Sequence, residues 1–574
     1  MNEQEKRLLA DVSLDEPWAL VEAFAGIVRE HPTDVNRAAD VLTERLRALG
    51  VPVTVYEPEL YLSLPKGARV EADGATFRAK PPSYSADARD GLSAPLVYVP
   101  AAFAVGSDDV FDTLDAEAAK RVDVRGKIVL TEGFANPANT AHFEAAGALG
   151  LIAVNPGEDI HWGTCTTVWG TPGLGDLERK PGIPAAAVNR PDGERLKALA
   201  GRQASVTLYT EMEEGWYRSK VPVVELRGRT EPDKFVLLHG HYDSWSIGIG
   251  DNTTGDATML EVARVLKKHQ QELRRSVRIA WWPGHSTGRY AGSTWFADTF
   301  ALDLYEDCVA QVNCDSPGCR WATEYKDVSL TAETASFAAG VIRDVTGKPM
   351  IAERAHQAGD YSFNNIGVSG YFMLLSTMPD ELRAEKGYYG VGGCGGNIAW
   401  HTENDTLEIA DKDILLDDIK IYALAAFRNA NVEVLPFDWR AATSEFAETL
   451  ARYQRAAGED FDLAPAAEAV DALHAALDSF YECVASGAIA SAEANDVIHS
   501  LARRLVPINF TTQGAFRHDP ALTIPPLPDL ALALRLGSLG EDERGFARME
   551  LLRGRNRVVA TLRDATRRVE RALA

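Results

Sequence analysis

The chain has 574 residues, of which 46% are hydrophobic and 25% are charged, as in an ordinary globular protein. It carries 59 lysine and arginine residues against 83 aspartate and glutamate residues, a formal net charge of −24. Because cationic side chains drive binding to nucleic acids and to anionic membranes, this balance argues against either kind of partner.

The amino-terminal residues MNEQEKRLLADVSLDEPW lack the basic and apolar regions of a secretory signal. No apolar run reaches the length that spans a membrane. The chain has six cysteines, and the closest pair in sequence, Cys314 and Cys319, is too widely spaced for a CxxC metal motif. We therefore expect a cytoplasmic protein with reduced thiols.

The first predicted elements are helices. Two amphipathic patterns lie between Glu16 and Gly50, and Pro52 follows the second as a stop signal. The next segment, VPVTVYEPELYLSL, alternates polar and apolar residues as a strand does. We assign residues 1–84 to the first part of a main α/β domain, and we interpret the proline- and serine-rich stretch 81–95 as a linker.

Residues 85–214 form a separate α/β pattern. Its buried strands are APLVYVP, GKIVLTEG and LIAVNP, and the helix before the last of these is AHFEAAGALG. The pieces at 126–130, 145–148 and 151–155 resemble the signature of a protease-associated domain, namely a "GKIVL" strand, a helix ending in "AGA.G" and an "IAVN" strand. The resemblance implies that this domain is inserted into the main one.

From residue 215 to residue 437, buried strands alternate with helices. The strands are KFVLLHGHYDSW, SVRIAWWPGH, CVAQVNCDSPG and GYFMLL. This alternation predicts a doubly wound, mostly parallel sheet with helices on both faces, in which ligands bind beyond the carboxyl ends of the strands. After residue 437 the periodicity becomes helical, which predicts a helical domain over 438–574.

The ends of the predicted strands carry two histidines and three aspartates: His241, Asp243, Asp251, Asp315 and His401. Zinc prefers imidazole nitrogen and carboxylate oxygen, and a bridging carboxylate can hold two ions together. Taken singly, each residue has an ordinary explanation, since a histidine at a strand end is often structural and Asp251 is a good helix cap. The set together predicts a metal site able to generate a hydrolytic nucleophile from water.

The motifs HGHYDSW, GDNTTGDATMLEVARVL, VNCDSPG and WHTENDT resemble those of the zinc aminopeptidase family that includes glutamate carboxypeptidase II and the transferrin receptor. The resemblance covers most of the chain. It implies a peptidase-like domain made of 1–84 and 215–437, a protease-associated domain over 85–214 and a helical dimerisation domain over 438–574. It also implies a homodimer that binds one or two zinc ions (or another divalent metal) and a peptide or small-molecule substrate.

The same resemblance assigns roles to the clustered residues. His241 and Asp315 hold one zinc ion, Asp251 bridges, and His401 holds the second ion. Asp243 orients His241 as a carboxylate behind the ligand.

The chain departs from the family after the strand IAWWPG. The family has two adjacent glutamates there, the first a general base and the second a ligand of the second zinc ion. Here His285 and Ser286 occupy those positions, and no glutamate lies between Glu272 and Glu306. Three interpretations stay open: His285 is the base, His285 is a metal ligand, or the site is inert as in the transferrin receptor. The retained histidines and aspartates favour an active or metal-binding site, and we favour the ligand role for His285.

Four residues are candidates for contact with a substrate. Arg289 and Tyr290 follow the departure, and a guanidinium group binds carboxylates in a bidentate fork, although such an arginine is more often solvated. Asp360 and Tyr361 lie in GDYSFNNIG, which resembles the family's pocket-lining loop and is otherwise a simple turn. The Lys-Tyr pair of glutamate-specific members is not visible, which argues against specificity for a carboxyl-terminal glutamate.

These observations lead to one main expectation. The chain is a metal-dependent hydrolase of an amide or peptide bond, of the aminopeptidase or carboxypeptidase kind, with His285-Ser286 in place of the Glu-Glu pair. One alternative is a catalytically inactive, receptor-like binding protein on the same scaffold. The other is a hydrolase of a small non-peptide amide or carbamate.

Overall fold

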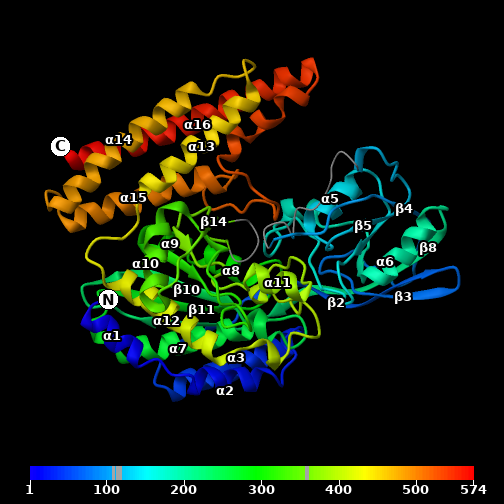
Figure 1. Cartoon of the computed structure of the whole chain (residues 1–574), viewed down its shortest axis with the longest axis horizontal. Helices are drawn as coiled ribbons and strands as arrows, with labels where there is room; N and C mark the ends of the chain where they lie inside the picture. The colour runs from blue at the N-terminus through cyan, green and yellow to red at the C-terminus, as the bar shows by residue number, and fades with distance from the viewer. Residues whose placement is uncertain (107–109, 111–118, 356–360) are drawn as a thin grey trace.

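A computed structural model describes residues 1–106, 110, 119–355 and 361–574 of the chain. Figure 1 shows a central sheet flanked by helices, a second sheet to its right, and a layer of long helices above it. Asp360, one of the predicted substrate residues, lies outside the described residues.

The central sheet is built mainly from the strands predicted between 215 and 437. Within the described residues its order is β1-β9-β11-β10-β12-β15. The strands are β1 (Val53–Tyr56), β9 (Val221–Leu226), β11 (Arg275–Trp282), β10 (Glu231–His241), β12 (Cys308–Asn313) and β15 (Gly370–Tyr371).

Strands β11, β10, β12 and β15 are parallel, whereas β9 and β1 join one edge in antiparallel pairing. The parallel centre was predicted, but the sheet as a whole is mixed. The connection from β9 to β10 spans only residues 227–230, which is too short for the helical crossover that parallel strands require.

Helices cover both faces of this sheet, as the buried strand runs predicted. On one face, Phe235 and Leu237 of β10 share a core with Phe296 of α8 (Ala291–Thr299) and with α9 (Ala301–Asp307). On the other face, Val236 and Leu238 pack in a core that includes α7 (Thr254–Lys268), α12 (Lys412–Asn431) and α10 (Ala335–Thr346). Successive residues of a strand point to opposite faces, so both faces are apolar.

The amino-terminal helices lie against the same side as α7 (Figure 1). They are α1 (Glu3–Ala10), α2 (Asp15–Phe24) and α3 (Pro32–Ala48). The second predicted helical pattern matches α3, which begins with a proline in its first turn.

The second sheet has the order β3-β2-β8-β4-β5-β6-β7 within the described residues. Its strands are β3 (Ala75–Ala79), β2 (Glu59–Ala72), β8 (Ser205–Arg218), β4 (Leu92–Tyr98), β5 (Ile128–Glu132), β6 (Gly150–Val154) and β7 (Ala185–Val188). Helices α5 (Pro137–Ala145) and α6 (Arg190–Ala200) accompany the parallel strands β5, β6 and β7.

Two predicted boundaries are corrected by this sheet. Strand β2, assigned from sequence to the main domain, pairs with β8 instead, from Glu59 opposite Arg218 to Glu71 opposite Thr207, and β3 pairs with β2 on its other side. Strand β8 therefore continues past the boundary predicted at 214. Residues 80–85 are buried and make strand-like bridges, so they do not form a free linker. Alternation predicts a strand, but it does not say which sheet the strand joins.

The carboxyl-terminal part is helical, with α13 (Trp439–Ala457), α14 (Ala464–Ser486), α15 (Ser491–Phe510) and α16 (Glu541–Leu573). Arg503 of α15 anchors this layer on the central domain. Its buried guanidinium donates hydrogen bonds to the backbone carbonyls of Leu304, Tyr305, Cys308 and Gly367. Several buried carbonyls thus share one cation, which fixes how the two parts pack.

No helix in the described part of the chain is both long and apolar enough to cross a membrane. All six cysteines are free thiols.

Candidate metal centre

The central sheet brings four of the predicted ligands together. His241 ends β10, Asp251 precedes α7, Asp315 follows β12, and His401 lies in the loop after residue 396. These segments meet at the carboxyl ends of adjacent parallel strands, where loops from one edge of the sheet converge.

Asp251 lies between the two histidines. Its Oδ1 is 2.9 Å from Nε2 of His241, and its Oδ2 is 3.0 Å from Nε2 of His401. Oδ2 of Asp315 lies 3.6 Å from the same Nε2 of His241. One carboxylate thus faces both imidazoles, which is the geometry expected of a bridging group.

The electrostatics of the cluster favour positive charge. Burial opposes protonation of His241, but the adjacent carboxylates of Asp251 and Asp315 outweigh it and raise the pKa of the imidazole. Burial also favours the neutral acid at Asp251, yet hydrogen bonds and charge from His241 and His401 hold the pKa of this carboxyl well below its usual range. The buried carboxylates therefore require a cation in contact with them.

His285 joins the side of the cluster formed by His241 and Asp315. It follows β11, and its ring stacks on that of His241, with centroids 3.8 Å apart and planes inclined by 17°. One ligand atom each from His241, His285 and Asp315 lie within 4.8 Å of one another. Ser286, the next residue, lines the pocket that contains Asp251, His285 and Asp315. Its carbonyl accepts a hydrogen bond from Ser83 Oγ at 2.7 Å.

Asp243 acts differently from the expectation. Nδ1 of His241 is 2.9 Å from the backbone carbonyl of Asp243, whereas the nearer carboxylate oxygen lies 3.9 Å away. The Asp243 carboxylate instead accepts hydrogen bonds from the backbone N–H of His285, at 3.0 and 3.1 Å. Its main chain therefore orients His241, and its side chain holds the segment that carries His285.

Three buried residues outside the predicted set hold the ligand loops. Asn252 donates to the carbonyls of His241 and Cys314, at 3.2 and 2.8 Å, and accepts from the backbone N–H of Ser316 at 2.9 Å. It thereby ties together the loops that follow β10 and β12 and the start of α7. The sequence motif contained Asn252 next to Asp251, but it did not show that Asn252 hydrogen-bonds to the loops after β10 and β12.

Arg29 and Asp405 both hydrogen-bond to the backbone of the loop that leads to Asp251. The fully buried Arg29 donates to the carbonyls of Tyr242, Ile247 and Gly248, at 2.7, 2.8 and 2.9 Å. Asp405 accepts from the backbone N–H groups of Gly250 and Asp251 at 2.7 and 3.0 Å, and burial raises the pKa of its carboxyl to about 7. Asp405 belongs to the WHTENDT motif, whereas no local pattern marked Arg29.

The cluster lines a pocket between the central domain and the second sheet. The other lining residues are mainly aromatic or aliphatic: Phe134, Ala135, Trp162, Trp245, Tyr290, Met373, Leu374 and Trp400. Trp162 and Trp245 stack, with planes 5° apart and centroids 5.9 Å apart. The pocket thus combines a charged metal-ligand set with an apolar lining, as small-molecule sites generally do.

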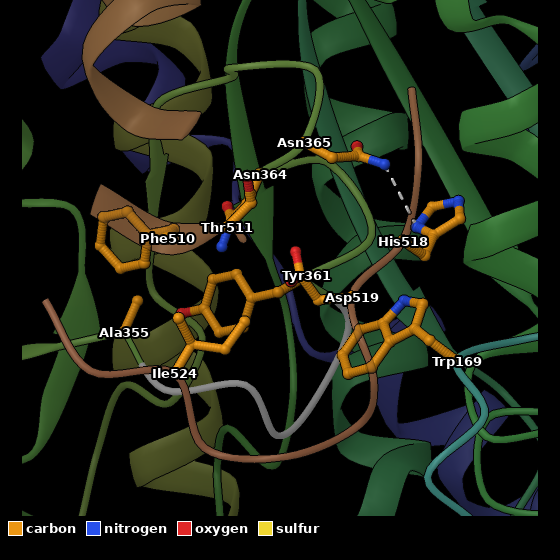
Figure 2. A pocket seen from close by; sticks show the side chains of 10 residues that line it. All are labelled: Trp169, Ala355, Tyr361, Asn364, Asn365, Phe510, Thr511, His518, Asp519 and Ile524. Atoms are coloured by element: carbon orange, nitrogen blue, oxygen red, sulfur yellow. Dashed lines mark hydrogen bonds between the residues drawn. The ribbon is translucent and has the colours of Figure 1, made fainter. Parts of the chain in front are cut away.

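The predicted substrate residues divide between two places. Arg289 and Tyr290 line the pocket of the metal cluster, and Nη1 of Arg289 donates to the hydroxyl of Tyr290 at 2.8 Å. Figure 2 shows Tyr361 in a neighbouring pocket, together with Trp169 and His518. Trp169 packs on Tyr290 with ring centroids 4.3 Å apart, so these two rings separate the pockets. Tyr361 therefore does not line the pocket of the metal cluster, which contains His285 and His401.

The residues of the cluster fit a zinc ion chemically. Imidazole nitrogens and carboxylate oxygens face one another across a few ångströms, and these are donors that zinc prefers. The loops that carry them are braced by hydrogen bonds, as in known metal sites.

Comparison with known proteins identifies two of the domains. Residues 223–425 match the profile of Peptidase family M28, and residues 92–196 match that of the PA domain, the protease-associated domain. The chain therefore contains an M28 peptidase domain joined to a PA domain, which confirms the family resemblance drawn from the motifs.

Curated relatives match over shorter stretches. The chain is 27% identical over 233 residues to "Probable glutamate carboxypeptidase VP8" of Zea mays, a match that covers 39% of this chain and 32% of the relative. It is 36% identical over 121 residues to "Aminopeptidase NAALADL1" of Rattus norvegicus, covering 20% of this chain and 16% of the relative. The matches thus span less than half of the relatives' own length.

Solved structures share the fold. An aminopeptidase from Aneurinibacillus sp. strain AM-1 superposes with a TM-score of 0.53 at 18% identity, covering 74% of this chain and 96% of that chain. BSAP, a zinc aminopeptidase from Bacillus subtilis, gives 0.52 at 20% identity, with coverage of 74% and 96%. These likenesses confirm the predicted α/β fold class.

Proposed function

We propose that this chain is a metal-dependent hydrolase of peptide or amide bonds. The observation that carries the proposal is the convergence of His241, Asp251, Asp315 and His401, with His285 stacked on His241, in a pocket of an M28 peptidase domain. Buried clustered ionisable groups in a cleft are typical of functional sites, because their burial is otherwise costly.

His241, His285 and Asp315 would hold one zinc ion, and Asp251 would bridge it to a second ion on His401. The ligand role of His285 is supported by its convergence with His241 and Asp315. Ser286 is a poor substitute for a glutamate ligand because its hydroxyl stays protonated, so the ion on His401 should bind more weakly. When bound, zinc supplies a Lewis acid and lowers the pKa of a coordinated water.

Within the described residues the pocket offers no glutamate as a general base, so proton transfer would need an imidazole that does not coordinate the metal. Among the described residues that line the pocket there are two histidines, His285 and His401, and no glutamate. His285 would take this role only as the alternative to its ligand role, because an imidazole nitrogen that coordinates zinc cannot accept a proton.

The lining of the pocket points to the substrate. Its aromatic and aliphatic side chains favour an apolar group on the substrate, because each buried methylene contributes about 0.8 kcal/mol. Arg289 also lines the pocket, and a guanidinium group is of the kind that binds carboxylate and carbonyl oxygens. We therefore propose a small peptide or aminoacyl amide with an apolar side chain as the substrate class.

The proposal is tested with metal-depleted protein, reloaded with zinc, manganese or cobalt and incubated with a mixed library of short peptides and aminoacyl amides. Metal-dependent cleavage, detected by mass spectrometry, is the expected result. A protein that binds no metal and cleaves no member of the library would instead support the receptor-like binding function.

We also propose that the helical domain pairs two subunits. Phe546 and Met549 of α16 support this, since their large apolar side chains are 75% and 49% exposed and lie three residues apart on one helix. Sedimentation at micromolar concentration should show a dimer, and replacing Phe546 by aspartate should shift it toward a monomer.

A further inference from the structure

A loop of the PA domain is bound to the segment that carries His401. The backbone N–H of Trp162 donates to the carbonyl of His401 at 2.9 Å, and Nδ1 of His401 lies 3.0 Å from the carbonyl of Trp162. Two hydrogen bonds thus run in opposite directions between one residue of the PA domain and one candidate metal ligand.

The second of these bonds selects a tautomer. A backbone carbonyl only accepts hydrogen bonds, so Nδ1 of His401 must carry the hydrogen. Nε2, which lies 3.0 Å from Asp251 Oδ2, is then the nitrogen left to face the metal site. The PA domain therefore decides which ring nitrogen of His401 is presented.

The backbone of His401 also needs external support. Its φ angle is 56°, in the left-handed region that residues other than glycine adopt at a cost. The hydrogen bond that the His401 carbonyl accepts from Trp162 helps to hold this conformation.

Lys80 locks the same two segments together. Its Nζ donates to the carbonyl of Ile160 and to Oε2 of Glu403, both at 2.6 Å, and lies 3.4 Å from the ring centroid of Trp162. The Lys80 side chain is 7% exposed, so this ion pair is shielded from water on the lysine side. One ammonium group thus contacts the segment that carries Trp162 and the segment that carries His401.

Two further contacts join the segments. Nδ1 of His161 is 2.7 Å from the carbonyl of Trp400, and its Nε2 is 2.8 Å from the hydroxyl of Tyr389. Burial lowers the pKa of His161 to about 3, so the ring is neutral, and Nδ1 donates to the carbonyl while Nε2 accepts from the hydroxyl. Nδ2 of Asn404 donates to Asp159 at 2.9 Å.

We propose that the PA-domain segment 159–162, locked by the Lys80–Glu403 ion pair, is a positioning element that fixes the orientation and tautomer of His401. The metal consequence rests on the proposed function, whereas the positioning itself does not. Residues behind metal ligands typically change metal affinity or activity by about 10–100-fold when they are replaced. Loss of the Lys80–Glu403 ion pair should therefore lower the affinity for the ion on His401. The affinity for the ion on His241, His285 and Asp315 should not change.

The test compares Lys80→Met and Glu403→Gln with Lys197→Met in the full-length chain. Lys197 makes an equally close pair with Glu132, at 2.5 Å, inside the PA domain, and so controls for loss of a buried ion pair there. Hydrogen–deuterium exchange reads the amides of 397–405, and equilibrium dialysis with zinc followed by elemental analysis reads the affinity of each ion.

In both lock variants we expect exchange in 397–405 to accelerate by about 10-fold or more, with affinity for the weaker ion reduced by about 10–100-fold. Lys80→Arg, which keeps the charge, should restore part of both. The Lys197→Met control should match the wild type in this segment.

Unchanged exchange in 397–405 in both lock variants would overturn the positioning role, whether the wild type binds two ions, one or none. A wild type without metal, combined with accelerated exchange in the variants, would remove the hydrolase proposal and leave the positioning role standing. An equal loss of affinity for both ions in the lock variants would show general destabilisation and overturn the inference. Equal changes in exchange or affinity in the Lys197→Met control would do the same.

Discussion

Trp162 and His401 lie 239 residues apart in sequence and hydrogen-bond to each other twice. One residue belongs to the PA domain and the other to the M28 domain, at the edge of the metal cluster. The PA domain is therefore part of the candidate site and not only an appended module.

The first prediction concerns His285. If it is a metal ligand, His285→Ala should lose metal and turnover together. Elemental analysis and steady-state kinetics on the same sample measure both. Full metal content with turnover reduced by about 10²–10⁴-fold would assign His285 the base role instead.

The second prediction concerns Asp251, which faces both histidines. Asp251→Ala should lose more metal than Asp315→Ala, because Asp251 contacts both imidazoles and Asp315 contacts one. Stoichiometry after dialysis at equal free zinc decides the order. An Asp251→Ala protein with full metal and activity would contradict the bridging assignment.

The third prediction concerns Arg29. Arg29→Met removes the guanidinium donor from the carbonyls of Tyr242, Ile247 and Gly248, and a buried carbonyl that keeps no other donor costs about 1–3 kcal/mol. We expect a marked loss of unfolding free energy in urea and weaker metal binding. Arg37→Met is the matched control, since the Arg37 side chain is 58% exposed in a surface ion pair. Equal stability of the two variants would refute the bracing role of Arg29.

The fourth prediction concerns pH and Glu333. Burial raises the pKa of this carboxyl to about 7, from 4.5, so the folded state binds the proton more tightly than the unfolded state. The stabilisation is present below pH 4.5 and is lost as the pH rises through 7. Relative to the wild type, Glu333→Gln should therefore gain stability between pH 5 and pH 8.5, on the order of 3 kcal/mol. Parallel stability curves for the two proteins over this range would refute it.

Much of the site was predictable from local patterns. His241 and Asp315 each follow an apolar run long enough for a buried strand, and parallel strands place such ends together. The motifs around Asp251 and His401 completed the set, and the family comparison confirmed the resemblance. The departure at His285 and Ser286 was also visible in the sequence, although the stacking of His285 on His241 was not.

Other features depended on pairing between distant segments. The alternation in residues 59–72 predicted a strand correctly, but only the tertiary structure places it against β8 in the second sheet. The sequence likewise did not show that the packed rings of Trp169 and Tyr290 separate Tyr361 from the pocket of the metal cluster.

The sequence by itself determined which residues are apolar, which strands they form and which polar groups follow those strands, because periodicity and turn chemistry are local. Only the tertiary structure decided that the Asp243 carboxylate holds His285, that Arg29 braces the Asp251 loop and that Trp162 orients His401. Hydrogen bonds of this kind satisfy buried groups wherever the packed chain brings a partner within about 3 Å, and sequence separation places no limit on that choice.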